Sequence, residues 1–176
     1  MRVLAVLVSL AVLSPAVADA PKPSEKVKKR LGEKAATLLD GATKVEVFRV
    51  GGELGAKPKG KTIASYSIIG TGKDQDEKFA AKLAGVILDE KTYEWEAAKG
   101  CIFNPGVAFR VWKGEESVVV VICFSCDQVR VAPVDKDGKV EKGVYANVDP
   151  GRAALLKLAK AALPDDKEIR QLKETR

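Results

Sequence analysis

The sequence predicts an α+β fold, in which a mainly antiparallel sheet has helices packed on one face. Three observations support this prediction. Strand-like segments follow one another through hairpin turns, such as Asp137-Gly138, and not through helical crossovers. The run Val118–Ile122 is apolar on both faces, which indicates a central strand covered on both sides. Segments of helical periodicity complete the order α-β-β-α-β-β-β-β-α-α.

The first helix is expected to be capped by Ser24 and to end at Gly41. β-Branched residues then predict strands at Thr43–Val50 and Thr62–Ile69, which are able to pair as a hairpin with a long loop. The apolar stripe of the first helix consists of Val27, Leu31, Ala35 and Leu38.

A second helix is expected to begin at Asp74, with Glu77 completing a capping box, and to run to about Leu88. Strands at Val107–Trp112 and Ser117–Phe124 then flank a polar turn, which is the pattern of a β-hairpin. The residues of the second helix that share its apolar face are Phe79, Leu83, Val86 and Ile87.

Two further strands are expected at Gln128–Val134 and Lys139–Val148, joined by a type I′ turn. Asp149-Pro150 has the cap and first-turn proline of a helix start. Asp165 with Glu168 is expected to cap a last short helix. The residues of the longer helix expected to face inward are Leu155, Leu158, Ala159 and Ala162.

Residues 1–18 have the pattern of a cleavable secretory signal peptide, and residues 19–176 are expected to form a single α+β domain. A positive start precedes an apolar run and small residues, with cleavage expected after Ala18 or, less favourably, after Ala20. The apolar run is shorter than the roughly 20 residues that cross a bilayer, so no transmembrane span is expected in the mature chain. The protein is therefore expected to be exported and to be periplasmic or secreted.

The chain of 176 residues has a net charge of +6, with basic clusters in the first helix and in the loop before the second strand. Two interpretations of these clusters are open. They are either ordinary solvated surface, or a patch that binds an anionic surface of the cell envelope, such as acidic glycans or lipid headgroups. Nucleic acid is not expected as a partner, because the few aromatic residues are not interleaved with the basic ones. The clusters are Lys26, Lys28, Lys29 and Arg30, and Lys57, Lys59 and Lys61.

Three cysteines, Cys101, Cys123 and Cys126, predict one disulfide and one remaining thiol in an oxidising compartment. If Trp112 lies opposite Ser117, alternation of side chains puts Cys101 and Cys126 on one face and Cys123 on the other. This register favours a Cys101–Cys126 disulfide. A disulfide between Cys101 and Cys123 remains an alternative. A disulfide between Cys123 and Cys126 requires a tight turn after the strand.

Three segments resemble a group of exported bacterial proteins of unknown function, over roughly Lys61 to Leu172. The resemblance implies export and a shared cysteine hairpin, and it implies no activity, cofactor or functional residue. The segments are Gly72–Phe79, Cys101–Arg110 and Ile122–Cys126, of which the cysteine hairpin is the most specific.

The absence of histidine excludes Ser-His-Asp and Cys-His nucleophiles and histidine-ligated zinc hydrolases. Gly70–Lys73 resembles a phosphate loop only in part, because Ser67 replaces the first glycine and Asp74 the magnesium-binding hydroxyl. No catalytic residue, metal site or cofactor is therefore predicted. Trp95 and Trp112 are candidates for packing or for ligand contact.

These observations favour a non-enzymatic, disulfide-stabilised binding or structural module of the cell envelope. The alternative is an extracytoplasmic thiol–disulfide protein using Cys123 and Cys126. That alternative requires a reactive thiol, whereas the pair follows a buried-looking strand and does not begin a helix.

Overall fold

The computed structural model describes residues 22–51, 57–135 and 137–175. The predicted signal peptide, residues 1–18, lies outside the described residues, as does part of the predicted loop between the first two strands.

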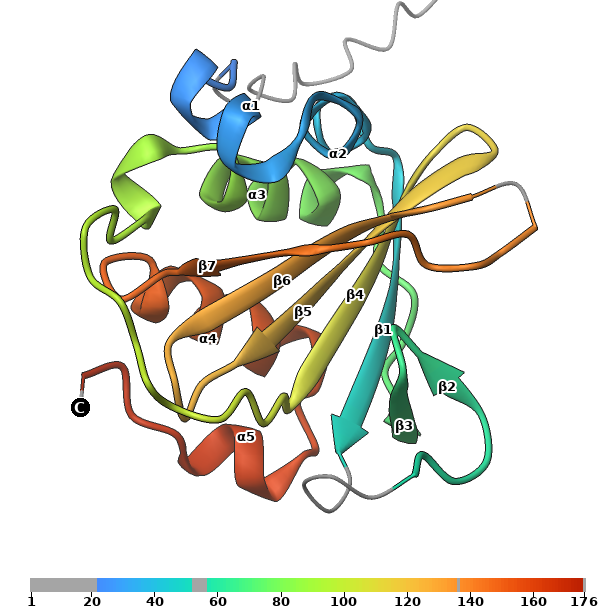
Figure 1. Ribbon diagram of the computed structural model, residues 1–176. Helices are drawn as coiled ribbons and strands as arrows, with labels where there is room; N and C mark the ends of the chain where they lie inside the picture. The colour runs from blue at the N-terminus through green and yellow to red at the C-terminus, as the bar shows by residue number, and fades with distance from the viewer. Residues whose placement is uncertain (1–21, 52–56, 136, 176) are drawn as a thin grey trace, which may run out of the picture.

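A seven-stranded antiparallel sheet is the centre of the fold, with the strand order β2-β3-β1-β4-β5-β6-β7 (Figure 1). Together with the helices it confirms the α+β prediction. Its strands are β1 (Lys44–Gly51), β2 (Thr62–Ile63), β3 (Tyr66–Thr71), β4 (Val107–Lys113), β5 (Glu116–Cys123), β6 (Gln128–Val134) and β7 (Val144–Asn147).

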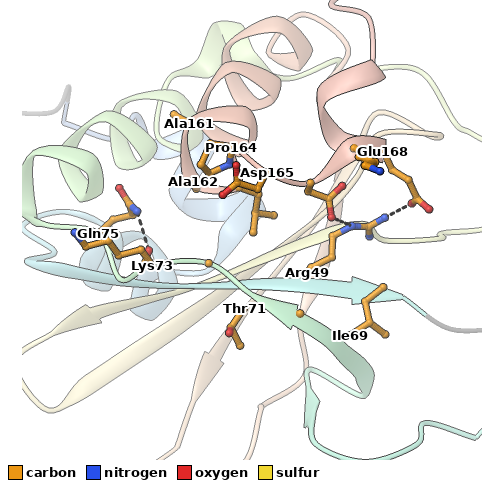
Figure 2. A pocket seen from close by; sticks show the side chains of 15 residues that line it. Arg49, Ile69, Thr71, Lys73, Gln75, Ala161, Ala162, Pro164, Asp165 and Glu168 are labelled. Carbon is orange, nitrogen blue, oxygen red and sulfur yellow. Dashed lines mark hydrogen bonds and ion pairs between the residues drawn. The ribbon is translucent and has the colours of Figure 1, made fainter.

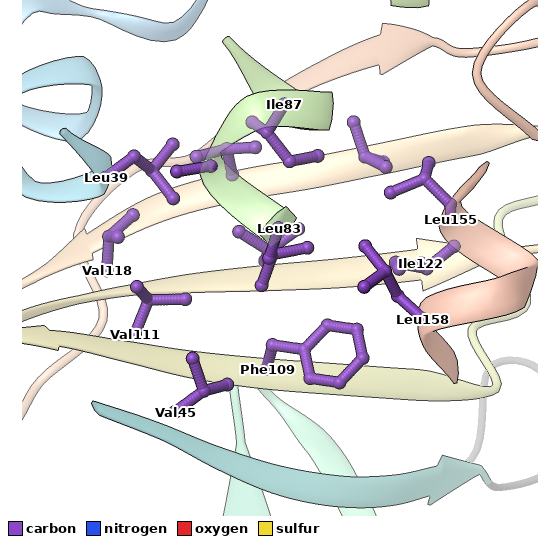
Figure 3. Close-up of a cluster of buried hydrophobic side chains, with 14 of the residues drawn as sticks. Leu39, Val45, Leu83, Ile87, Phe109, Val111, Val118, Ile122, Leu155 and Leu158 are labelled. Atoms are coloured by element: carbon purple, nitrogen blue, oxygen red, sulfur yellow. The ribbon is translucent and has the colours of Figure 1, made fainter. Parts of the chain in front are cut away.

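The longer helices pack on one face of this sheet. Side chains of α2, α3 and α4 point toward the central strands, where Leu39, Leu83 and Leu155 meet Phe109 and Ile122 (Figure 3). The helices are α1 (Glu25–Leu31), α2 (Glu33–Leu39), α3 (Glu77–Ile87), α4 (Arg152–Ala162) and α5 (Lys167–Gln171), with a 3₁₀ turn η1 at Glu90–Thr92. Burying this apolar face is the main favourable contribution to the fold.

The opposite face of the sheet has a smaller apolar cluster of its own. Val119 and Val121 of β5 face it, together with Ala108 of β4. The turn between β2 and β3 folds over this face and buries Ala64, which is 3% exposed. Strand β5 is consequently buried on both sides, as its continuous apolar run predicted.

The β4–β5 hairpin has the predicted register, with Trp112 opposite Ser117. Gly114 forms the turn with φ 61°, in the left-handed region that glycine enters without a steric penalty. Strand β1 also pairs with β3, as the long-looped hairpin prediction required.

Two predicted elements are divided in the structure. The first helix breaks at Gly32, whose backbone (φ 86°, ψ 141°) is open only to glycine and separates α1 from α2. The strand predicted at Thr62–Ile69 is interrupted at Ala64 and Ser65, which form a tight turn with φ 49° and 71°. Apolar periodicity continues through both breaks, so it did not reveal them.

Two predicted helix caps are displaced along the chain. Asp76, not Asp74, accepts the first-turn N–H of α3, from Phe79 at 3.0 Å, because Asp74 instead pairs with Lys44 at 2.9 Å. Asp166, not Asp165, caps α5 by accepting the N–H of Ile169 at 2.9 Å.

The last two strands and α4 also differ from the prediction. The turn after β6 closes between Asp135 and Lys139, so it is wider than the two-residue turn predicted at Asp137-Gly138. Strand β7 is shorter than Lys139–Val148, because only Val140 pairs with β6 before the register shifts. Helix α4 begins at Arg152 after a turn at Asp149–Gly151, since the Asp149 carboxylate pairs with Lys99.

Candidate functional site

A disulfide joins Cys101 to Cys126, the pair that the hairpin register favoured. Cys126 is buried in the turn between β5 and β6, whereas Cys101 is exposed in the segment before β4. The third cysteine, Cys123, is in no disulfide and is buried with 0% exposure. Its Sγ accepts the N–H of Asn104 at 3.3 Å and lies 3.2 Å from Ser125 Oγ. Cys123 and Cys126 are therefore not paired with each other.

The disulfide is one of several contacts that fix the segment between η1 and β4. Glu94 N–H donates to the Asn147 carbonyl of edge strand β7 at 3.0 Å. Lys99 Nζ donates to the Cys126 carbonyl at 2.7 Å and pairs with Asp149 at 2.6 Å. A segment without regular secondary structure is thus held to the sheet at several points, and it carries Trp95.

Trp95 forms the wall of a groove between α1 and the outer edge of β7. Its indole N–H donates to the Glu90 carbonyl at 3.1 Å, and its ring lies 5.2 Å from that of Tyr93. The groove has a volume of about 510 Å³. It is lined by Lys26, Lys29, Arg30, Trp95, Val144 and Tyr145.

Two cations of α1 lie against the Trp95 ring. Lys26 Nζ is 4.2 Å from the ring centroid and the Arg30 guanidinium carbon is 5.4 Å from it. Both residues are on the surface of a short helix, one turn apart, so their side chains project on the same side. The ring quadrupole attracts both charges and holds them in the groove.

The electrostatics of the groove are positive. Glu90 neutralises part of the charge, since its carboxylate lies 3.4 Å from Lys26 Nζ and accepts the Ser24 hydroxyl at 2.8 Å. The Ser24 hydrogen bond, with the charge of Lys26, lowers the pKa of Glu90. Lys29 and Arg30 have no ion pair with a carboxylate among the described residues. The groove can therefore attract an anion.

The structure brings together only some of the predicted candidates. Lys28 points elsewhere and pairs with Glu25 at 2.8 Å, and this hydrogen bond raises the pKa of Lys28. The exposed lysines of the loop before β2 do not line the groove. Trp112 lies in β4 against Arg110 and not with Trp95. Sequence reasoning missed Tyr145, whose only signal was an aromatic residue in the last strand.

A larger cavity of about 740 Å³ lies between β3 and the turn that joins α4 to α5 (Figure 2). Its most prominent cation is Arg49, which donates to Asp166 at 3.0 Å, to the carbonyls of Val50 and Gly106 at 2.7 Å each, and to Glu168. All three nitrogens of this guanidinium already donate hydrogen bonds, two of them to the carboxylates of Asp166 and Glu168, so its charge is already paired.

The glycine-rich stretch Gly70–Lys73 borders the same cavity and has a packing role. A Cβ at Gly72 would lie 2.6 Å from the Ala162 carbonyl, so glycine allows the close approach of this strand to α4. Gly70 and Thr71 are the last residues of β3, and the Gly72 N–H donates to the Val47 carbonyl of β1 at 2.9 Å, so the stretch continues the strand and does not lead directly into a helix as a phosphate loop does.

The part of the chain that the structure describes contains no group of three or more Cys, Asp or Glu residues arranged to hold a metal ion. Within the same residues, every helix is too short or too polar to cross a bilayer. Comparisons of the chain with protein-family models, with curated proteins and with solved structures found no match.

Proposed function

We propose that the protein is an exported, non-enzymatic module of the cell envelope that binds an anionic surface through the groove of Lys26, Lys29, Arg30 and Trp95. The observation that carries this proposal is the convergence of three cations on one groove, two of which, Lys26 and Arg30, lie against the Trp95 ring. The shared chemistry of the ligands is a carboxylate or phosphate group, as in an acidic glycan or a lipid headgroup.

Two properties of the groove support binding over simple solvation. Like charges held close together repel one another, and an anion placed between them removes that repulsion. The disulfide and the Lys99 contacts fix the segment that carries Trp95, so little ordering is needed on binding. The disulfide is also consistent with export to an oxidising compartment.

Binding is tested at low salt with three probes: polygalacturonate, neutral dextran and vesicles containing phosphatidylglycerol. The double variant Lys29→Gln/Arg30→Gln is expected to weaken binding to the anionic probe by tenfold or more, since each cation near an anionic surface contributes about 1 kcal/mol. The matched control Lys57→Gln/Lys59→Gln removes the same charge from the exposed loop. Binding should fall as salt rises.

The probes distinguish the two sources of the anion. Binding to polygalacturonate alone assigns an acidic glycan, and binding to vesicles alone assigns a lipid surface. Equal losses in the two double variants would show that only net charge matters, which would contradict the groove as the site. The same contradiction follows if neither anionic probe binds at low salt.

The thiol–disulfide alternative has less support. It requires Cys123 and Cys126 to exchange a disulfide, whereas Cys126 pairs with Cys101 and Cys123 is buried. Mass spectrometry with alkylation before and after graded reduction tests it. Protection of Cys123 until unfolding favours a structural disulfide, and a readily reduced Cys123–Cys126 bridge would replace our proposal with the redox function.

A further inference from the structure

We propose a second binding site, for a small carboxylate with a short apolar body, on the sheet face opposite the helices. This inference is independent of the groove beside α1. The site is a cavity of about 360 Å³ between the β2–β3 turn, the β6–β7 connection and strands β4 and β5. The residues on which the argument rests are Thr62, Ser65, Arg110, Val119, Lys139 and Val140.

Arg110 provides the positive charge at this site. It lies on β4 and is half-buried, with its Nε donating to Ser117 Oγ at 3.0 Å and its guanidinium 4.2 Å from the centroid of the Trp112 ring. These two contacts fix the plane of the guanidinium. A guanidinium held in a fixed plane can bind a carboxylate through two parallel N–H···O hydrogen bonds, one from each outer nitrogen.

The outer nitrogens of Arg110 are available for such bonds. Neither Nη1 nor Nη2 makes a hydrogen bond or an ion pair with any residue that the structure describes. Glu46 of β1 lies directly opposite Arg110 in the strand pairing. Its carboxylate forms an ion pair with Lys44, whose Nζ is 3.4 Å away. A half-buried guanidinium whose outer nitrogens make no hydrogen bond favours an anionic partner, because burial makes its attraction for an anion stronger than in water.

The wall of the cavity is a backbone turn in an uncommon conformation. Ala64 and Ser65 have φ of 49° and 71°, although tight hairpin turns of this kind strongly prefer Asn-Gly. Arg130 holds the turn by donating to the Ala64 carbonyl at 2.7 Å. Left-handed non-glycine residues cluster at ligand-binding sites, and here the turn brings Ser65 to the cavity beside Thr62.

The remaining walls specify the rest of the ligand. Val119 and Val140 give the cavity an apolar side, and Lys139 adds a second positive charge at its rim. A carboxylate on Arg110 thus leaves a short hydrocarbon chain against the valines. The hydroxyls of Thr62 and Ser65 suit a second polar group on the ligand, such as an alcohol or amide.

The test uses the disulfide-bonded protein and three probes: hexanoate, the uncharged hexanamide, and inorganic phosphate. Binding is followed by the shifts of backbone amide signals in two-dimensional NMR. We expect saturable shifts with hexanoate at Val119, Ser65 and Val140, and none at these positions with hexanamide. Phosphate lacks the apolar body and is expected to bind more weakly than hexanoate.

Two variants connect these shifts to the proposed residues. Arg110→Lys keeps the charge but loses the fork, and it is expected to weaken hexanoate binding about tenfold. Lys139→Gln changes an exposed side chain at the rim of the cavity, with an expected loss of roughly threefold. Lys157→Gln, on the exposed side of α4, is the control and should bind normally.

Hexanamide binding as tightly as hexanoate would overturn the proposal, as would unchanged affinity in both the Arg110 and Lys139 variants. Tighter binding of phosphate than of hexanoate would assign the cavity to phosphate groups and exclude a carboxylate. The measurements do not involve the groove beside α1, so their failure leaves the proposed function unaffected.

Discussion

At the scale of single residues, the pair of Arg152 and Asp127 is the most buried ion pair among the residues that the structure describes. The guanidinium donates to Asp127 and to the Phe124 carbonyl, and both side chains of the pair are less than one-tenth exposed. Asp127 has φ 50°, so the ion pair also holds a left-handed residue directly after the disulfide cysteine.

We predict that Arg152→Met destabilises the protein by about 3 kcal/mol, because it removes the hydrogen bonds of the guanidinium to the Asp127 carboxylate and to the carbonyls of Phe124 and Lys173 at a buried position. Urea unfolding measures this loss, with Lys157→Met as a control on an exposed position of the same helix. A loss below about 1 kcal/mol would mean that the carboxylate is compensated in another way.

The sequence allowed the cysteine pair to be predicted but not this ion pair. Strand alternation is local, and one correct register, Trp112 opposite Ser117, placed the cysteine side chains. Arg152 and Asp127 meet only because α4 packs across the end of β5, which no periodicity encodes. The groove could not be predicted for the same reason. The cations of α1 and Trp95 were identified separately in the sequence, and their contact depends on tertiary packing.

At the scale of the elements, Gly32 sets the direction of α1 and hence of the groove cations. Its backbone conformation is accessible only to glycine, while a Cβ there would have open space around it. We predict that Gly32→Ala destabilises the protein by about 1–3 kcal/mol through backbone strain alone. Gly100→Ala is the matched control, since its Cβ also has open space and its φ is not in the left-handed region. Equal stability of the two variants in urea unfolding would contradict this explanation.

The disulfide acts on another element, the segment that carries Trp95. We predict that Cys101→Ser/Cys126→Ser lowers the free energy of unfolding by about 3 kcal/mol, since it opens a loop with a sequence separation of 25. Amide hydrogen exchange in residues 97–104 should accelerate at Asn104, whose N–H donates to Cys123 Sγ beside the disulfide. Unchanged exchange in that segment would show that its hydrogen bonds suffice to fix it.

Elements with a continuous apolar pattern were predicted well, and their ends were not. The apolar pattern of the sequence predicted strand β5 and the inward face of α4, and the residues of that pattern are the buried ones. Two of the predicted caps have a competing partner, since Asp74 pairs with Lys44 and Asp149 with Lys99, whereas no such partner explains why Asp166 replaces Asp165. Such partners are distant in sequence, so a cap motif alone does not decide where a helix starts.

At the scale of the whole molecule, the two faces of the sheet differ in chemistry. The helix face buries the large apolar core, whereas the other face combines a small apolar cluster with Arg110, Arg130 and aromatic rings. Tyr66 and Tyr145 both contact the ring of Phe103 there, with centroids at 6.0 and 5.1 Å. Both proposed ligand sites use cations held by aromatic rings, one at the sheet edge and one on this face.

The half-buried Tyr66 and the buried Tyr93 couple the stability of the whole molecule to alkaline pH. Burial, with a smaller effect of Tyr145, raises the pKa of Tyr66 to about 12, and burial also raises the pKa of Tyr93. Because the unfolded tyrosines ionise near pH 10, their contribution to stability is complete below about pH 10 and is lost as the pH rises toward the folded pKa values.

We therefore predict that the free energy of unfolding in urea falls progressively above about pH 10. The raised pKa values of the exposed Lys28, Lys34 and Lys44 act in the same direction, so a variant is needed to isolate the tyrosines. Tyr93→Phe removes a phenol that donates to the Ile87 carbonyl inside the core. This variant should be less stable at neutral pH and should lose less stability between pH 10 and pH 11 than the natural chain. An identical alkaline loss in both proteins would assign the effect to Tyr66 and the lysines and contradict a role of Tyr93.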